Sequence, residues 1–305
     1  MKLGLLTAAF PTLTLDEIAD WASAAGFETL EVACWPAGEG AARRYAGVCH
    51  IDVDKLDGPA AGRIVAELDR RGLAISALAY YPNPLSPDPE ARAAAHGHLR
   101  KVIEAADLLG VDTVGTFVGR DRTRSLPDSL ADFRDVWPQL VAHAASHGVR
   151  IAIENCPMIF SEDEWPGGDN LAYSPAIWRE MFTAIPDDNF GLNFDPSHLI
   201  WQMIDVERAV YEFGERIFHV HGKDLEVRPD GLYEHGVMSV GMGWQVPRLC
   251  GLGQVDWGRF IGALYAVGYD HVVSIEHEDR RFEGSVELVQ RGFEIARNTL
   301  RPLLA

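Results

Sequence analysis

The chain has 305 residues, of which 47% are hydrophobic and 24% are charged, a composition typical of a soluble globular protein. The formal net charge of −18 argues against the basic surface of a nucleic-acid binder, so we expect no nucleic-acid partner. Four cysteines without CxxC spacing indicate reduced thiols, and the first apolar run is too short to span a bilayer. We therefore expect a cytoplasmic protein that does not associate with membranes.

Short β-rich runs alternate along the chain with amphipathic helical stretches. The predicted strands cover residues 2–10, 28–35, 73–81, 111–119, 150–156, 190–196, 217–223 and 271–278. Between them, apolar residues repeat at helical spacing, and several helical stretches end in a glycine directly before the next strand. About eight strand–helix units predict an α/β fold, namely a (β/α)8 TIM barrel that occupies residues 1–305 as a single domain.

Four of the predicted strands end in a residue that can bind a metal. These residues are Glu154, Asp195, His221 and Glu276. Because side chains alternate along a strand, residues two apart share a face, and each of the four shares its face with a small or polar residue. The opposite faces carry large apolar residues that helices would cover. The four side chains are therefore expected to point toward the barrel axis at the C-terminal ends of the strands, where barrel active sites lie.

Three carboxylates and one imidazole in so small a space need a cation or raised pKa values. We expect one divalent metal, and the oxygen-rich donor set favours Mn²⁺ while also suiting Mg²⁺, Co²⁺ or Zn²⁺. The alternative is that the four residues are separate charges at strand ends. His198, in the turn after Asp195, could reach the same rim or could be a solvent-exposed residue at a helix start.

Other side chains near strand ends are candidates for substrate binding. They are Glu31, Trp35, His50, Tyr81 and Arg248. The two aromatic residues could form an apolar wall against a substrate, and packing at the rim is the alternative for each. Arg248 belongs to a long insertion at residues 225–250, and a second insertion covers residues 158–173. Insertions at the catalytic end of a barrel are often lids or oligomer contacts.

The segments IAIENCP, NFDPSHL, HVHGKD and SIEHED resemble, in this order, the metal-site segments of the xylose-isomerase-like barrel family. This family of sugar isomerases and epimerases includes tagatose 3-epimerase and inosose-processing relatives. The segment GLGQVDW at residues 251–257 also resembles the family, and the likeness spans essentially the whole chain. The resemblance implies that Glu154, Asp195, His221 and Glu276 hold one divalent metal. The same resemblance places His198 and Lys223 near the substrate.

The expected activity is isomerisation or epimerisation of a ketose or related keto-polyol through a metal-stabilised enediolate. In the resembling epimerases two glutamates remove and return the proton on opposite faces, roles that the resemblance implies for Glu154 and Glu276. His198 could polarise a substrate oxygen. Asp224 and Glu226 do not complete a second metal cluster, which favours proton transfer over a hydride shift.

Three alternatives differ in class from this expectation. A lyase acting on a keto-sugar, keto-inositol or oxidised glycoside would use the same metal and glutamates but expel a β-substituent. An endonuclease IV-like phosphodiesterase is disfavoured because the third and fourth strands end without extra histidines. A non-catalytic sugar- or metal-binding barrel is disfavoured by the intact ligand set.

Because such barrels often pair through their loops, a homo-oligomer is expected.

Overall fold

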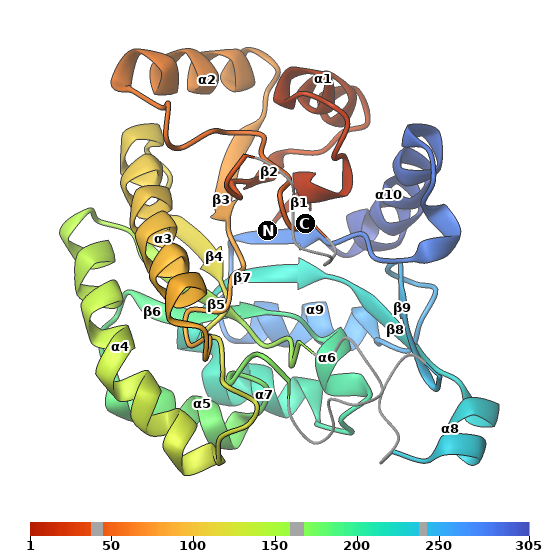
Figure 1. Cartoon of the computed structure of the whole chain (residues 1–305). Coiled ribbons are helices and arrows are strands. Elements are labelled where there is room, and N and C mark those ends of the chain that lie inside the picture. Colours follow the sequence, from red (N-terminus) through yellow and green to blue (C-terminus); the bar gives the residue numbers. More distant parts are fainter. Residues whose placement is uncertain (38–44, 159–167, 238–242, 305) are drawn as a thin grey trace.

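Eight parallel strands close into a barrel with helices outside it, as the sequence predicts (Figure 1). This computed structural model describes residues 1–37, 45–158, 168–237 and 243–304. The barrel strands are β1 (Lys2–Leu6), β2 (Thr29–Ala33), β3 (Ala74–Ala79), β4 (Thr113–Thr116), β5 (Arg150–Glu154), β6 (Phe190–Phe194), β7 (Ile217–Gly222) and β10 (Val272–Ile275). Strands that follow one another along the chain are neighbours, and β10 closes the barrel against β1.

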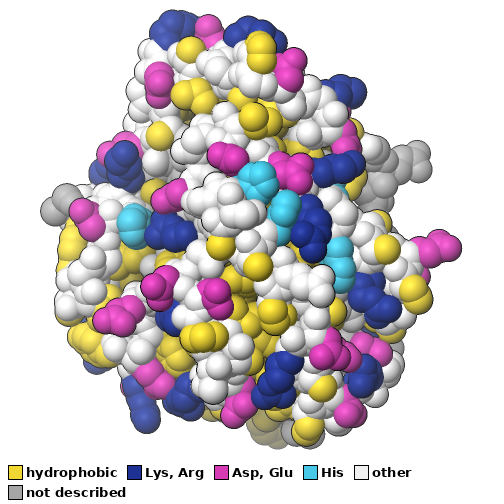
Figure 2. Space-filling view, turned by 90° about the vertical axis from the view of Figure 1, so that its left-hand side faces the viewer, with side chains coloured by type: hydrophobic (Ala, Val, Ile, Leu, Met, Phe, Trp, Pro, Cys, Tyr) yellow, Lys and Arg dark blue, Asp and Glu magenta, His cyan; other side chains and the backbone are white. Residues whose placement is uncertain are grey.

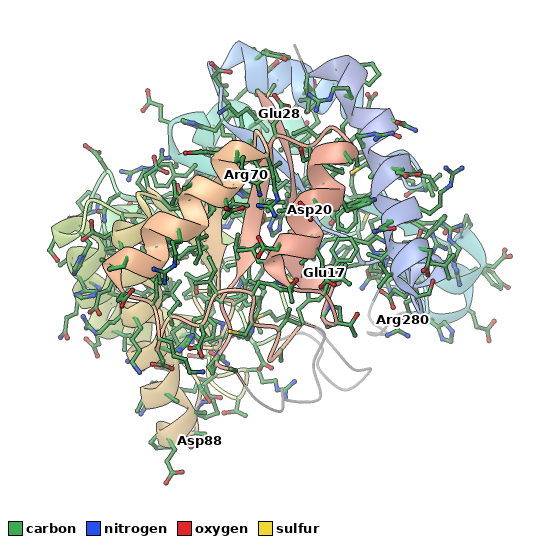
Figure 3. All side chains as sticks on the ribbon, turned by 90° about the horizontal axis from the view of Figure 1, so that it is seen from above. Glu17, Asp20, Glu28, Arg70, Asp88 and Arg280 are labelled. Carbon is green, nitrogen blue, oxygen red and sulfur yellow. The ribbon has the colours of Figure 1, made fainter. Side chains whose placement is uncertain are left out.

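Helices connect the strands on the outside of the barrel. They are α1 (Leu15–Ala24), α2 (Gly58–Arg70), α3 (Pro89–Leu109), α4 (Leu126–Ser146), α5 (Pro175–Ala184), α6 (Ser197–Ile200), α7 (Val206–Phe213), α9 (Trp257–Ala266) and α10 (Val286–Leu300), with 3₁₀ turns η1 (Thr7–Ala9), η2 (Gly214–Arg216), η3 (Arg280–Phe282) and η4 (Arg301–Leu303). Local sequence determines where α1 begins, since Thr14 and Glu17 form a reciprocal capping box. Asp20 of α1 faces the end of α2 near Arg70 (Figure 3) and binds the neighbouring Arg71 guanidinium at 2.6 Å.

A small antiparallel pair of strands interrupts the barrel pattern between β7 and α9. It consists of β8 (Asp224–Val227) and β9 (Gln245–Arg248), with α8 (Pro229–His235) between them. The predicted insertion at residues 225–250 is thus partly regular structure. Residues 238–242 of this insertion and 159–167 of the other one lie outside the described residues.

Large apolar side chains fill the layer between sheet and helices. Phe190 packs against Trp137 of α4, and Phe194 stacks on Phe260 of α9. Asn193, between these two phenylalanines in β6, points the opposite way and contacts His221 inside the barrel. The alternation of outward apolar and inward polar residues predicted for this strand is therefore present.

The surface carries charges of both signs. On the face shown in Figure 2, acidic and basic side chains are interspersed. Within the described part of the chain, no helix combines the length and the apolar character needed to cross a membrane.

Candidate metal centre

Four buried side chains converge at the C-terminal end of the barrel. Glu154 ends β5, Asp195 directly follows β6, His221 lies in β7, and Glu276 directly follows β10. One potential ligand atom of each residue lies within 4.8 Å of those of the other three. The structure thus brings together the four residues that the sequence singled out.

The donor atoms of this cluster fit a divalent cation. Among the described residues, Glu154 Oε1, Asp195 Oδ2 and His221 Nδ1 are buried and have no hydrogen-bond partner. Buried polar atoms are usually hydrogen-bonded, so three inward-facing atoms without such a bond fit a site for a further cation beside Lys223, whose Nζ atom lies 2.9 Å from Asp195 Oδ2. Carboxylate oxygens with one imidazole nitrogen suit Mn²⁺, Mg²⁺ or Zn²⁺.

Lys223 neutralises part of the carboxylate charge at this centre. Its Nζ atom lies 2.6 Å from Glu276 Oε2, 2.9 Å from Asp195 Oδ2 and 3.3 Å from Glu278 Oε2. Burial acts to lower the pKa of Lys223, but these carboxylates raise it well above its usual value. The side chain is therefore a cation at neutral pH, and it also lies 3.0 Å from His198 Nε2.

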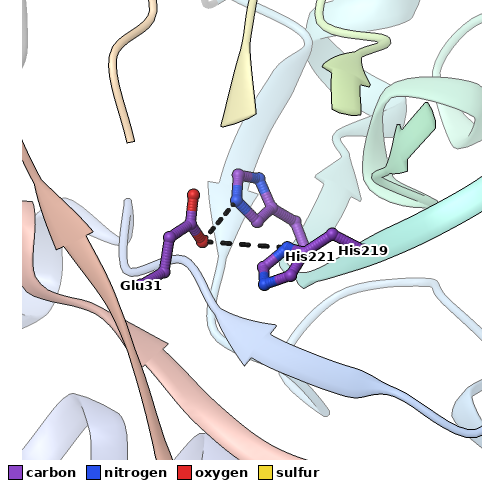
Figure 4. Close-up of side chains that lie close together, drawn as sticks. All are labelled: Glu31, His219 and His221. Atoms are coloured by element: carbon purple, nitrogen blue, oxygen red, sulfur yellow. Dashed lines mark hydrogen bonds and ion pairs between the residues drawn. The ribbon is translucent and has the colours of Figure 1, made fainter. Parts of the chain in front are cut away.

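Glu31 lies beneath His221 and contacts the ring nitrogen that faces away from the ligand cluster. Its Oε2 atom is 2.9 Å from His221 Nε2 (Figure 4). The same oxygen accepts a hydrogen bond from Ser274 Oγ. Tyr81 donates a second hydrogen bond to Oε1 at 2.6 Å. Burial acts to raise the pKa of Glu31, but the neighbouring His221 lowers it to about 2. An ionised Glu31 favours a proton on Nε2, while Nδ1 faces Glu154 and Glu276.

His219 lies one pleat deeper than His221, and Figure 4 shows both rings beside Glu31. Its Nδ1 atom is 4.0 Å from Glu31 Oε2 and 3.1 Å from Asn193 Oδ1, while Nε2 is 3.2 Å from Ser76 Oγ. Burial lowers the pKa of His219 to about 4, so the ring is neutral at pH 7. His219 therefore belongs to the hydrogen-bonded residues that lie below the candidate metal centre in the barrel.

Two buried asparagines hold the strand ends in register. Asn155 accepts a hydrogen bond from the Asp195 backbone N–H at 2.7 Å and donates one to the Asp195 carbonyl oxygen at 2.9 Å. Asn170 donates to the carbonyl oxygens of Glu154 and Cys156. The positions of the two carboxylates from β5 and β6 are thereby linked to each other.

The other predicted site residues lie in two different environments. His198, at the start of α6, lies 3.3 Å from Asp195 Oδ2 and 3.5 Å from Glu154 Oε1. Trp35 and Tyr81 line a cavity of about 60 Å³ beside Glu154 and Glu276, which we call the inner cavity.

His50 and Arg248 lie in hydrogen-bonded surroundings outside this cavity. Both ring nitrogens of His50 have partners, namely Thr7 Oγ1 at 2.9 Å and the Phe10 carbonyl oxygen at 3.1 Å. Arg248 is buried and binds Glu226 and Asp279, which links β9 to the segment after β10.

Five lining residues of the inner cavity were not predicted from the sequence. They are Leu6, Tyr45, Phe117, Cys156 and Glu278. Cys156 and Glu278 follow Glu154 and Glu276 by two residues, so the same alternation could have pointed to them. Tyr45 comes from a loop and carries no such signal.

Asp224 does not belong to a second metal cluster. Its carboxylate accepts hydrogen bonds from the backbone N–H groups of Leu225, Gly251 and Val255 and from the Trp257 indole. It therefore anchors the GLGQVDW segment to the start of β8. A Cβ atom at Gly253 would overlap Asp224 Oδ1, so glycine allows this close approach.

Known proteins share both sequence and fold with this chain. The family model described as xylose isomerase-like TIM barrel matches residues 19–299. The uncharacterized protein YfiH of Bacillus subtilis (strain 168) is 29% identical over 313 residues, which cover 92% of this chain and 93% of that protein.

Solved structures with low sequence identity have the same fold. The IolI protein with a bound zinc atom matches with a TM-score of 0.73 at 17% identity, covering 100% of this chain and 98% of that one. D-psicose 3-epimerase from Clostridium cellulolyticum H10, solved with D-tagatose, matches with a TM-score of 0.69 at 15% identity, covering 100% and 99%. By its family match and its closed eight-stranded barrel, the chain belongs to the xylose isomerase-like TIM barrel family.

Proposed function

We propose that the protein is a divalent-metal-dependent sugar isomerase or epimerase that acts on a ketose or related keto-polyol by proton transfer. One observation carries the proposal. One potential ligand atom of each of Glu154, Asp195, His221 and Glu276 lies within 4.8 Å of the others, and three of the residues present a buried polar atom without a hydrogen bond. These four residues would hold the metal, with Mn²⁺ favoured by three carboxylates among four donors.

A cation in this position would withdraw electron density from a substrate carbonyl and so acidify the adjacent C–H bond. Glu154 and Glu276 would move the proton. Glu154 ends β5 and Glu276 directly follows β10, and these strands are three positions apart around the barrel, so the two carboxylates would approach a substrate from different sides. An epimerase needs this arrangement, because one group removes a proton and another returns it to the opposite face.

Both glutamates are ionised at neutral pH, as bases must be. Burial acts to raise the pKa of each carboxyl, but His198 and His221 lower that of Glu154, and Lys223 lowers that of Glu276. Lys223 and His198 lie between these carboxylates and can donate hydrogen bonds to substrate oxygens. We assign them to substrate orientation and polarisation.

The remaining candidate residues fall into two groups, those that line the inner cavity and those that support the residues around it. Trp35 and Tyr81 present aromatic surface to the inner cavity and would pack against the sugar. Glu31 has hydrogen bonds to both oxygens, so we propose that it acts on the substrate only through His221. His50 and Arg248 would shape the surrounding loops, since their polar groups already bind protein atoms.

The experiment is incubation of the Mn²⁺-loaded protein with a panel of ketoses and keto-polyols in D₂O, followed by NMR. An isomerase or epimerase gives a deuterium-labelled isomer, whereas an unsaturated product would instead indicate a lyase. Glu276→Gln should abolish labelling, and Glu234→Gln on the exposed face of α8 should leave it unchanged. Absence of both labelled isomer and unsaturated product across the panel would contradict the proposal.

A further inference from the structure

A second and larger cavity adjoins the inner cavity. It has a volume of about 500 Å³ and lies among the segment after β1, the segment at residues 45–48 and the start of α10. Its walls include Phe10, Val48, Val286 and Val289. We call it the outer cavity. Nothing in the proposed proton transfer uses these residues.

The two cavities differ in what they can hold. Ligand pockets in proteins usually measure about 300–1,000 Å³. The inner cavity, at about 60 Å³, is far below that range, whereas the outer cavity lies within it. The inner cavity is therefore suited to the reacting end of a substrate, and the outer cavity offers the volume for a further group.

Tyr45 connects the two cavities, since it lines both. Its hydroxyl donates a hydrogen bond to the carbonyl oxygen of His277, the residue that follows Glu276. Its φ angle of 65° places an aromatic residue in the left-handed region, a conformation that needs support from its surroundings. Tyr45 is thus a shared lining residue of the two cavities, held directly beside a proposed metal ligand.

The lining of the outer cavity determines the chemistry of its occupant. No lysine or arginine is among its described lining residues, and Glu283 adds a carboxylate at the entrance to α10. Most of the described lining residues are apolar, and apolar walls with a few polar groups suit a group with an apolar face.

We propose that the outer cavity binds an apolar-faced substituent attached to the sugar, such as the aglycone of a glycoside. The attachment to a sugar rests on the proposed function, whereas the apolar character of the occupant rests on the cavity alone. The substrate would extend past Tyr45, with its carbonyl carbon near Glu154 and Glu276 and its substituent against Phe10 and Val289.

The test compares methyl β-D-glucopyranoside with phenyl β-D-glucopyranoside as probes of the Mn²⁺-loaded protein, with dissociation constants measured by calorimetry. Burial of the phenyl ring should tighten binding by at least about tenfold. Val289→Trp fills the outer cavity and should remove this gain. Leu288→Trp, on the exposed side of the same helix, is the matched control and should keep it.

Ala46→Phe fills the cavity from the opposite wall and serves as a second variant if Val289→Trp melts at a lower temperature than the parent. Equal affinity for the two probes, or no binding of either, would overturn the proposal. A phenyl gain that survives both filling variants would also overturn it. If simple ketoses are labelled with deuterium but the phenyl glucoside binds no more tightly than the methyl glucoside, only the proposal for the outer cavity fails. If the phenyl glucoside binds more tightly but no ketose is labelled, only the proposed reaction fails.

Discussion

His221 Nε2 and Glu31 Oε2 lie 2.9 Å apart, so a carboxylate from β2 orients an imidazole on β7 across the barrel. The two strands are three positions apart in the barrel order, and both side chains are fully buried. This contact leaves Nδ1 of His221 facing Glu154 Oε1 at 3.5 Å and Glu276 Oε2 at 3.4 Å. The orientation of His221, a proposed metal ligand, therefore depends on a residue outside the proposed ligand set.

Replacing Glu31 tests this dependence. Glu31→Gln should lower Mn²⁺ affinity at pH 8 by roughly 10- to 100-fold, because the amide no longer supplies the charge that orients and polarises the His221 ring. Calorimetric titration of the metal-free protein measures the change. Glu28→Gln, directly before β2, is the matched control and should bind Mn²⁺ like the parent. Unchanged affinity in Glu31→Gln would show that Glu31 does not support the ligand.

Metal binding should depend on pH through His221. Burial acts to lower the pKa of this ring, but Glu31 and Glu276 raise it well above its usual value, so the metal-free ring is protonated at pH 7. A cation at Nδ1 must displace that proton, so the affinity for Mn²⁺ should rise with pH until the metal-free ring has lost its proton. Titrations in two buffers with different ionisation enthalpies should detect about one released proton per Mn²⁺ near pH 7. Proton uptake on binding would contradict this assignment.

Lys223 should stabilise the metal-free protein more than the metal-loaded one. Its Nζ atom lies within 4.0 Å of four carboxylates, so Lys223→Met leaves buried negative charge uncompensated. The expected loss in EDTA is about 3 kcal/mol, or a melting temperature lower by roughly 5 °C or more. Saturating Mn²⁺ should reduce the difference. Lys101→Met, which removes an exposed ion pair with Asp54, should change the melting temperature little in either state.

Asp224 should contribute to stability without contributing to metal binding. Asp224→Ala removes four hydrogen bonds and leaves buried donors unpaired, which should cost about 3 kcal/mol. Gly253→Ala should also destabilise the fold, since the added methyl overlaps Asp224 Oδ1. Thermal unfolding measures both losses, and metal content should remain that of the parent. A loss of metal in Asp224→Ala with an unchanged melting temperature would place Asp224 in the metal centre.

The family and the barrel could be predicted from the sequence because both depend on local patterns. Strand alternation determines which residues share a face, and parallel strands in a closed barrel end on the same side. Glu154, Asp195, His221 and Glu276 could therefore be grouped from their positions at strand ends. The structure places them together, and their role as metal ligands stays a prediction.

Supporting contacts could not be predicted in this way. Asn155 reaches Asp195 across 40 residues, and Tyr45 reaches His277 across 232. The two residues of each contact are not separated by a strand or helix repeat, so their spacing in the sequence does not predict the contact. Asp224 looked from its position like a neighbour of the metal site, but its carboxylate is turned toward the segment at residues 251–257.

The sequence by itself determined the architecture, the positions of four candidate ligands at strand ends and the family, because alternation and chain order specify them. Only the tertiary structure decided that Glu31 supports His221, that Lys223 neutralises the carboxylates and that two cavities meet at Tyr45. The physical reason is that hydrogen bonds, ion pairs and cavities depend on distances between atoms of remote segments. Those distances exist only once the barrel has closed.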